Sequence, residues 1–544
     1  MTEQTSPSDS IRHYHQATKH TLQRYAAGPE TLDWDDQPQA FRWFDGAAKT
    51  DLPLSADSQQ ALYIDLYQPD KPTAQPLTLS NLACLLELSF GLSAWKQYGA
   101  AKWPLRCNPS SGNLHAEEAY VISNQLDGLD AGVYHYLSRD HQLEQRCKIE
   151  TGLLAPDTLD TLLIGISSVQ WREAWKYGER AYRYCQLDTG HAIAALRYAA
   201  AVLGWQVTML DNSSDAQINS LLGLDRPDDF GKTEAEHPDV LLQISMASEV
   251  ADEIAGIDLD KLLAACEAGE WQGKANVLSE QHMYKWPIID QVSQAAEKPV
   301  TQTPATTTHS LPAPLTNPCQ LEAASLIRRR RSAQAFDGKT HISSESFYRM
   351  LDMTLPRHQI APWDSSPWIN NINLLLFVHR VDGIKPGLYS LVRNPDTFES
   401  YKAALSREQF QWQNVEECPD HLPLYNLVNA NGQKLATTLA CHQGIAGQSC
   451  FSLAMLADCS AIEDANWHYR HLYWEAGMIG QVLYLEAEAA DVQGTGIGCY
   501  FDDAVHEMLG ISDKRWQSLY HFTVGKGHQD GRVQTIQPYA HLNR

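Results

Sequence analysis

The feature that most constrains this chain is a single Pro- and Thr-rich stretch that divides it. The stretch KPVTQTPATTTHSLPAPLTNP, residues 298–318, has no apolar periodicity and cannot bury enough surface to fold alone, so we expect an extended linker. It separates residues 1–297 from residues 319–544. Because 544 residues exceed what one ordinary hydrophobic core accommodates, the sequence predicts two folded halves joined by this linker.

The two halves look like a diverged repeat. The triplet YRY at residues 182–184 precedes a long apolar segment, and YRH at residues 469–471 precedes another with the same spacing. The second segment contains Gly477 and Gly480. Since glycine costs a helix roughly 1 kcal/mol relative to alanine, we expect these residues to permit a close helix contact. Coincidence between two ordinary apolar helices is the alternative, but the repeated order of the patterns favours a repeat.

The local patterns predict an α+β fold. Amphipathic helical patterns follow Thr78 and Ser343, which are both N-cap candidates. Alternating or continuous apolar runs predict strands at Ala119–Ile122, Val133–Leu137, Val240–Ile244, Leu374–His379, Gly387–Leu391 and His521–Val524. Because helices and strands are mixed without regular β–α–β alternation, we expect helices packed on mainly antiparallel sheets.

Composition excludes several classes of function. The net charge of −24 argues against a general nucleic-acid binder and against docking on an anionic membrane, since both need basic patches. The polar N-terminus and the lack of a long apolar run predict neither a signal peptide nor a membrane span. Eleven cysteines without a CxxC motif fit reduced thiols in the cytoplasm, and no spacing of ligands predicts a metal site.

The segment RCNPSSGNLHAEEAYV, residues 106–121, combines polar and flexible residues just before a predicted strand. Pro109, Ser110, Ser111 and Asn113 are the candidate site residues here, because ligands tend to bind loops held by a rigid scaffold. The segment resembles the Pro-Ser-Ser-x-Asn loop that contacts the flavin in FMN-dependent nitroreductases. That resemblance implies a redox enzyme with bound FMN, and it requires a phosphate-binding site elsewhere in the chain.

The run RRRRSAQAF, residues 328–336, is the candidate phosphate-binding site. Arginine binds phosphate through paired, charge-assisted hydrogen bonds, although a solvated helix end is the alternative when the run is taken alone. The run resembles the nitroreductase Arg-x-Ser motif for the FMN phosphate, with Arg330, Arg331 and Ser332 at matching positions. Gln334 stands where a second basic residue is usual in that family.

The segment QGTGIGCYFDD, residues 493–503, contains three alternating glycines. Glycine lets the backbone approach a flat ring closely, although a plain turn explains the pattern equally well. After a long helix, the segment resembles the nitroreductase loop beside the flavin ring, which implies roles for Gly496, Ile497 and Gly498. It lacks the spacing of a dinucleotide-binding GxGxxG motif.

The resemblance also implies how the two halves combine. Nitroreductases bind each FMN at a dimer interface, and here the required motifs are divided between the halves. We therefore expect two tandem nitroreductase-like domains that form an intramolecular pseudo-dimer, with one composite FMN site and a second, degenerate site. Lys526 and Arg532, near the C-terminus, are further phosphate-contact candidates, with surface positions as the alternative. Such pseudo-dimers could pair into a homodimer.

The closest resemblance is to the azoline-oxidising dehydrogenases of thiazole/oxazole-modified peptides, the SagB type. Lys176 and Tyr177, within WKYGERAYRY, match the Lys-Tyr pair of that group, which implies a role in proton removal. A surface pair at a helix start is the alternative. The resemblance implies an oxidoreductase acting on a small molecule or a modified peptide. A nitro or quinone reductase using NAD(P)H and a non-catalytic flavin-binding module are the alternatives.

Overall fold

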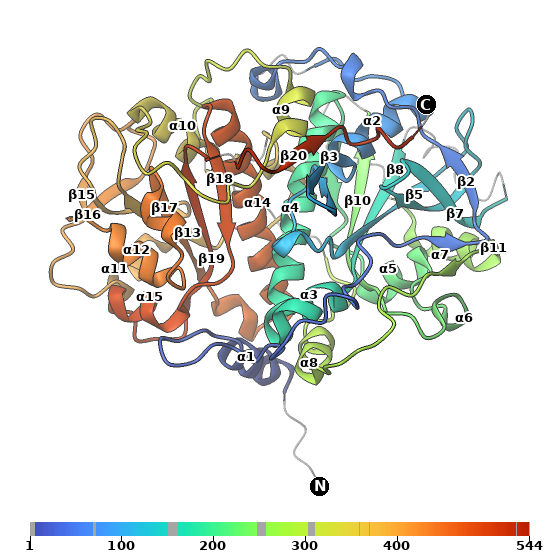
Figure 1. The fold of residues 1–544 in the computed structure, drawn as a ribbon, viewed down its shortest axis with the longest axis horizontal. Helices are drawn as coiled ribbons and strands as arrows, with labels where there is room; N and C mark the ends of the chain where they lie inside the picture. Colours follow the sequence, from blue (N-terminus) through green and yellow to red (C-terminus); the bar gives the residue numbers. More distant parts are fainter. Residues whose placement is uncertain are drawn as a thin grey trace, which may run out of the picture.

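The computed structural model shows two sheets on either side of two long central helices (Figure 1). It describes residues 6–68, 72–150, 161–246, 257–302, 310–357, 359–368, 370–528 and 530–542. The central helices are α4 (Ala181–Val202) from the first half and α14 (His468–Ala489) from the second. Both are buried along nearly their whole length because they pack against each other and between the sheets.

The first sheet follows the order β11-β7-β6-β5-β8-β10-β9, and β2 pairs with β7. Its strands are β2 (Ala48–Asp51), β5 (Glu117–Ser123), β6 (Gly132–Leu137), β7 (Gln142–Lys148), β8 (Thr161–Ser168), β9 (Gln206–Met209), β10 (His237–Ser245) and β11 (Glu270–Trp271). The second sheet follows the order β15-β16-β14-β13-β17-β19-β18. Its strands are β13 (Ile372–Val378), β14 (Gly387–Leu391), β15 (Gln413–Asn414), β16 (Leu424–Asn429), β17 (Phe451–Asp458), β18 (Gln493–Ile497) and β19 (Trp516–Gly525).

Every pairing between these strands is antiparallel. All six predicted strands coincide with strands of the structure, and only His379 lies one residue beyond the end of β13. The predicted caps are also confirmed. Thr78 accepts a hydrogen bond from Asn81 at the start of α2 (Leu79–Ser89), and Ser343 caps α10 (Ser344–Met353) in the same way. The α+β prediction is therefore confirmed.

The remaining helices cover the sheets and the ends of the central pair. They are α1 (Pro7–Ala17), α3 (Gln170–Tyr177), α5 (Asp215–Leu222), α6 (Pro227–Phe230), α7 (Leu259–Ala268), α8 (Pro287–Ala295), α9 (Ala323–Arg329), α11 (Phe398–Ala404), α12 (Gln433–Leu439), α13 (Gly444–Gln448) and α15 (Asp502–Leu509). None of the helices among the described residues is both long and apolar enough to cross a bilayer.

The central helices touch at their glycines. A Cβ atom added at Gly190 would lie 2.2 Å from the Trp474 carbonyl oxygen, and one added at Gly477 would lie 2.2 Å from the Leu187 carbonyl oxygen. Both helices therefore need a residue without a side chain where they cross. One continuous apolar core extends from this crossing into both halves.

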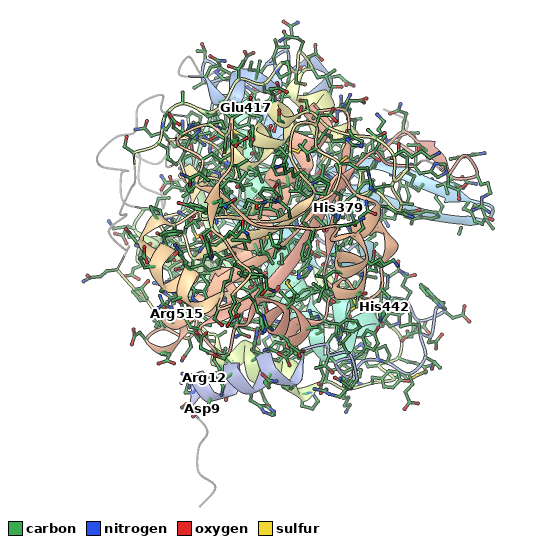
Figure 2. All side chains as sticks on the ribbon, turned by 90° about the vertical axis from the view of Figure 1, so that its left-hand side faces the viewer. Asp9, Arg12, His379, Glu417, His442 and Arg515 are labelled. Atoms are coloured by element: carbon green, nitrogen blue, oxygen red, sulfur yellow. The ribbon has the colours of Figure 1, made fainter. Side chains whose placement is uncertain are left out.

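A terminal segment of each half also contacts the other half. The C-terminal strand β20 (Gln534–Ile536) pairs with β3 (Leu92–Tyr98), which pairs with β4 (Ala101–Arg106). A separate two-stranded sheet within the first half joins β1 (Phe44–Asp45) to β12 (Lys274–Ala275). Beyond β20, Tyr539 accepts a hydrogen bond from the Leu92 amide at 2.9 Å. Conversely, α1 of the first half lies against the second half (Figure 2), where Arg12 pairs with Glu463 at 2.7 Å.

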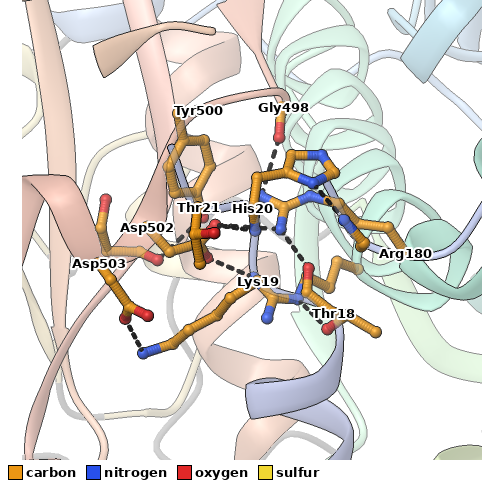
Figure 3. Close-up of polar contacts among 12 residues, drawn as sticks. Thr18, Lys19, His20, Thr21, Arg180, Gly498, Tyr500, Asp502 and Asp503 are labelled. Carbon is orange, nitrogen blue, oxygen red and sulfur yellow. Dashed lines mark hydrogen bonds and ion pairs between the residues drawn. The ribbon is translucent and has the colours of Figure 1, made fainter. Parts of the chain in front are cut away.

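Buried ion pairs link the halves near α1. Asp502, at the start of α15, pairs with Arg180 at 3.2 Å and with Arg183 at 2.9 Å (Figure 3). Burial disfavours its charged form, but the two arginines outweigh burial and hold the pKa of Asp502 well below its usual range. The described ends of the predicted linker are also attached, since Lys298 donates to the Ser213 carbonyl and Asn317 donates to Glu486. Residues 303–309 lie outside the described residues.

Candidate functional site

A cavity of about 840 Å³ lies between the two halves. Its volume falls within the roughly 300–1,000 Å³ typical of small-molecule sites. Its lining includes the predicted residues Pro109, Ser110, Ser111, Asn113 and Tyr177 from the first half and Arg330, Arg331, Ser332, Gln334, Gly496, Ile497, Gly498 and Lys526 from the second. The structure thus brings together motifs more than 200 residues apart in the sequence. Lys176 and Arg532 lie outside this lining.

The PSSGN loop is a tight 3-10 turn fixed by hydrogen bonds. The amide and hydroxyl of Ser111 both donate to the carboxylate of Asp188 on α4, at 2.7 and 2.8 Å. The Ser110 hydroxyl accepts from the His115 amide at 2.8 Å. Gly112 has a φ of +59°, and a Cβ atom there would lie 2.4 Å from the Tyr177 hydroxyl. The turn therefore needs glycine both for its backbone angle and for its contact with Tyr177.

Lys176 and Tyr177 support this loop from behind. They are the last residues of α3, so the alternative of a helix start is wrong. The Tyr177 ring lies 4.5 Å from the Tyr184 ring between centroids, and the Lys176 ammonium lies 5.3 Å from the centre of the Tyr177 ring. Burial raises the pKa of Tyr177 well above its usual range, and the charge of Glu173 adds to this effect. Its phenol therefore remains protonated and can donate a hydrogen bond into the cavity.

Three buried carboxyl groups lie behind the same loop. Neither carboxylate oxygen of Glu117 or Glu173 has a hydrogen-bond partner among the described residues. Burial and the neighbouring acids raise the pKa of both groups well above the usual range. Burial also raises the pKa of Asp188 although Ser111 donates two hydrogen bonds to it. These acids can therefore hold protons at neutral pH beside the cavity.

The arginine run closes α9 as predicted, and Arg330 caps that helix. The Arg330 guanidinium reaches across to the first half, where Nε and Nη2 donate to the Cys107 and Arg106 carbonyl oxygens, each at 3.3 Å. Its Nη1 atom is buried and has no hydrogen-bond partner among the described residues. Arg330 therefore lines the cavity with a guanidinium whose hydrogen-bonding capacity is not fully used by the described residues.

The other residues predicted to contact the phosphate differ in the hydrogen bonds and ion pairs that they already make within the protein. Arg331 donates to the Ser93 carbonyl at 3.0 Å, and Ser332 shares a 2.7 Å hydrogen bond with the Tyr484 hydroxyl. Lys526 lines the cavity but pairs with the carboxylate of Asp491 at 2.7 Å. Arg532 is exposed and pairs with Asp530, two residues away. These neighbours already make contacts within the protein, and Arg330 differs from them in having a buried Nη1 atom without a partner among the described residues.

The glycine segment is partly a strand, which corrects the prediction of a loop. Residues 493–497 form β18 and pair with β19, with Gly496 opposite Phe522. A Cβ atom at Gly496 would lie 1.7 Å from the Tyr520 hydroxyl, and one at Gly498 would lie 2.2 Å from the Tyr184 ring. The glycines thus let tyrosines pack against the strand on the cavity wall.

Sequence reasoning missed several lining residues. Both polar atoms of the Asn108 side chain are buried without a partner among the described residues, and Asn108 lines the cavity beside the predicted loop. On α4, His191 contacts the Tyr520 hydroxyl at 3.2 Å and lies on the same helix face as Tyr184 and Asp188. The helical spacing of Tyr184, Asp188 and His191 is a signal that could have found them.

On the other side of the central helices lies the region of the second half that corresponds to the PSSGN loop, and it contains protein side chains. When the two halves are aligned on a shared Ser-Ser pair, the loop Asp-Ser-Ser-Pro-Trp at residues 364–368 stands where PSSGN stands in the first half. Its Trp368 stacks on His471 with ring centroids 4.1 Å apart. Arg197 forms two hydrogen bonds with Asp364, at 2.8 and 2.7 Å.

Most of the second half matches a known protein family. Residues 327–526 match the model of the nitroreductase family. The trifolitoxin-processing protein TfxB of Rhizobium leguminosarum bv. trifolii is 28% identical over 168 residues, which are 28% of this chain and 45% of TfxB. A nitroreductase candidate of Methanocaldococcus jannaschii, MJ1384, is 26% identical over 157 residues, which are 27% of this chain and 76% of that protein.

One solved structure matches nearly the whole chain. It is a nitroreductase candidate from Anabaena variabilis, with a TM-score of 0.64 and 21% identity over 96% of this chain and 100% of that one. At this identity the match shows a shared fold. The chain spans less than half the length of TfxB, and the two-half fold as a whole has a counterpart in the Anabaena structure.

Proposed function

We propose that the chain is a nitroreductase-like protein of the SagB type and that it acts as an FMN-dependent oxidoreductase with one flavin site shared by its two halves. The observation that carries the proposal is the Arg330 side chain, which lines the cavity together with the PSSGN loop and has a buried Nη1 atom without a partner among the described residues. An unused buried charge is costly, so such a donor favours an anionic ligand.

The cavity fits the two ends of FMN. Arg330, Arg331, Ser332 and Lys526 provide cationic and hydroxyl donors for a phosphate group. Asn108 offers an unpartnered amide on the same wall as Ser110 and Asn113. Gly496, Ile497 and Gly498, with Tyr184 and Tyr520 behind them, provide a flat wall for an aromatic ring system. These are the residues that we assign to cofactor binding, together with Pro109, Ser111 and Gln334.

We assign a single site because the equivalent region is filled. Trp368 stands where the first half has Asn113, and a tryptophan stacked on His471 occupies space that a planar ligand would need. Arg197, next to this region, is paired with Asp364. The two halves then act as a pseudo-dimer in which one of two original sites remains usable.

The bound flavin would supply hydride transfer, and the protein would supply proton transfer and positioning. Tyr177 brings a protonated phenol to the cavity wall, and Lys176 lies directly behind it. We assign Tyr177 to relay the substrate proton and Lys176, after its ammonium group has lost a proton, to receive it. The buried acids Glu173 and Asp188 hold further protons beside this pair, which keeps the region close to electrical neutrality.

The proposed substrate is a modified peptide that contains an azoline ring, because TfxB processes the peptide trifolitoxin and the Lys-Tyr pair is the SagB-type feature. The test is to load the purified protein with FMN and add an azoline-containing peptide with oxygen as the electron acceptor. Gain of the aromatic azole, two mass units lighter, supports the proposal. Reduction of nitroaromatics by NAD(P)H without any azole product would instead support a nitroreductase. A protein that takes up no FMN would contradict both functions.

A further inference from the structure

Two cysteines from distant parts of the second half meet at the cavity. Cys499 lines the cavity directly after Gly498, and Cys441 follows α12. Both side chains are partly exposed, and each thiol affects the pKa of the other. We propose that Cys441 and Cys499 form a redox-active thiol pair that exchanges with small disulfides entering the cavity.

The surrounding backbone holds the two thiols within reach of each other. On one side of the pair, the Phe501 amide donates to the Leu439 carbonyl at 2.8 Å. On the other side, the Gln443 side chain donates to the Cys499 carbonyl at 3.0 Å. These two contacts hold residues 439–443 beside residues 499–501, so Cys441 and Cys499 lie on neighbouring segments. A disulfide needs Cα atoms within about 7 Å, a separation that neighbouring segments can reach.

The groups around Cys499 favour its thiolate. His20 accepts a hydrogen bond from the Ala26 amide at Nδ1, so its proton lies on Nε2 and is available to Cys499. The hydrogen bond from Cys441, that from His20 and the charge of Arg180 lower the pKa of Cys499, against the opposing effect of burial. Arg180 donates to the Gly498 carbonyl at 3.0 Å (Figure 3). The other titratable groups that act on the pair are Tyr25, Tyr177, Tyr184 and Asp502.

The proposed reaction with a small disulfide, RSSR, has two steps. The Cys499 thiolate attacks one sulfur atom, forming a mixed disulfide and releasing one thiolate, RS⁻. Cys441 then loses its proton and attacks the Cys499 sulfur, which forms the Cys441–Cys499 bond and releases the second RS⁻. The two protein sulfurs are oxidised by two electrons, and the small disulfide is reduced to one thiol, which takes the proton from Cys441, and one thiolate.

Cys418 provides a matched control. It is partly exposed like the pair, but burial raises its pKa to about 12. Its hydrogen bond goes to the Leu422 carbonyl. Because reactivity toward disulfides follows the thiolate, Cys418 should remain reduced under conditions that oxidise Cys499.

The test treats the folded full chain with oxidised glutathione, blocks free thiols and maps the peptides by mass spectrometry. We expect a Cys441–Cys499 crosslink, the loss of two free thiols per chain and no retained glutathione. Cys441→Ser should instead retain one glutathione on Cys499, because the second step is removed. Cys499→Ser should give neither product, and Cys418→Ser should behave like the unchanged chain.

Far-ultraviolet circular dichroism of each variant checks that it is folded. If Cys441→Ser does not fold, Cys441→Ala replaces it in the same measurement. Glutathione on other cysteines without the crosslink, or no reaction at Cys499 in the folded chain, would overturn the proposal. The readout needs no bound flavin, so its failure is separate from failure of the proposed oxidoreductase activity.

Discussion

Replacing Arg330 by methionine should weaken FMN binding far more than it weakens the fold. Methionine keeps most of the aliphatic stem, but it removes the guanidinium, whose carbon lies 4.9 Å from the centre of the Tyr484 ring. The two hydrogen bonds that Arg330 makes within the protein are both 3.3 Å long and therefore weak, and its Nη1 atom has no partner among the described residues. A charge-assisted hydrogen bond contributes about 1.5–3 kcal/mol, which corresponds to a roughly 10- to 150-fold change in Kd.

The assay is titration of the purified apoprotein with FMN, followed by flavin fluorescence. Arg330→Lys should lie between the unchanged chain and Arg330→Met, because it keeps the charge without the paired donors. Arg532→Met is the matched control. Since Arg532 is exposed and paired with Asp530, its replacement should leave the Kd unchanged. A Kd for Arg330→Met within twofold of the unchanged chain would refute the assignment of Arg330 to the phosphate.

Three further substitutions test the scaffold around the site. Gly112→Ala should lower both FMN affinity and Tm, whereas Gly99→Ala, at a similar φ of +58° but in open space, should lower only Tm. Gly477→Ala should lower Tm by several degrees or prevent folding, because its Cβ atom meets backbone of the opposing helix; an unchanged Tm would contradict the close crossing. Asp502→Asn should cost about 3–5 kcal/mol at neutral pH in chemical denaturation, against a small effect of Asp503→Asn at a half-exposed pair. Because the native pKa of Asp502 lies below its unfolded value, its contribution is present above about pH 4 and is lost as the pH falls, so the variant should show a shallower acid dependence.

The sequence predicted the parts of the fold that depend on local patterns. The caps at Thr78 and Ser343 and the six strands were identified because short apolar and polar periods fix them locally. The glycine segment was predicted as a loop from its resemblance to the nitroreductase loop, whereas its pairing with β19 depends on a partner more than 20 residues away. Likewise, nothing near Tyr539 in the sequence indicates that the C-terminal segment pairs with the first half.

The sequence was sufficient to predict the separate motifs of the candidate site, but not how their side chains are arranged in space. PSSGN and the arginine run were identified from residue types, and the cavity lies where they meet. Asn108 and Asp188 were missed because their roles depend on which neighbours remain unpaired after folding. Arg532 was proposed for its charge alone, and in the structure its guanidinium forms an ion pair with Asp530.

The stoichiometry of bound FMN tests the central claim most directly. The claim is that one cavity, built by both halves, binds flavin, while Trp368 and the Arg197–Asp364 pair fill the equivalent region. The measurement is flavin released by denaturation, divided by protein concentration from amino-acid analysis after saturation and desalting. The account predicts one FMN per chain. Two FMN per chain, or none, would contradict it.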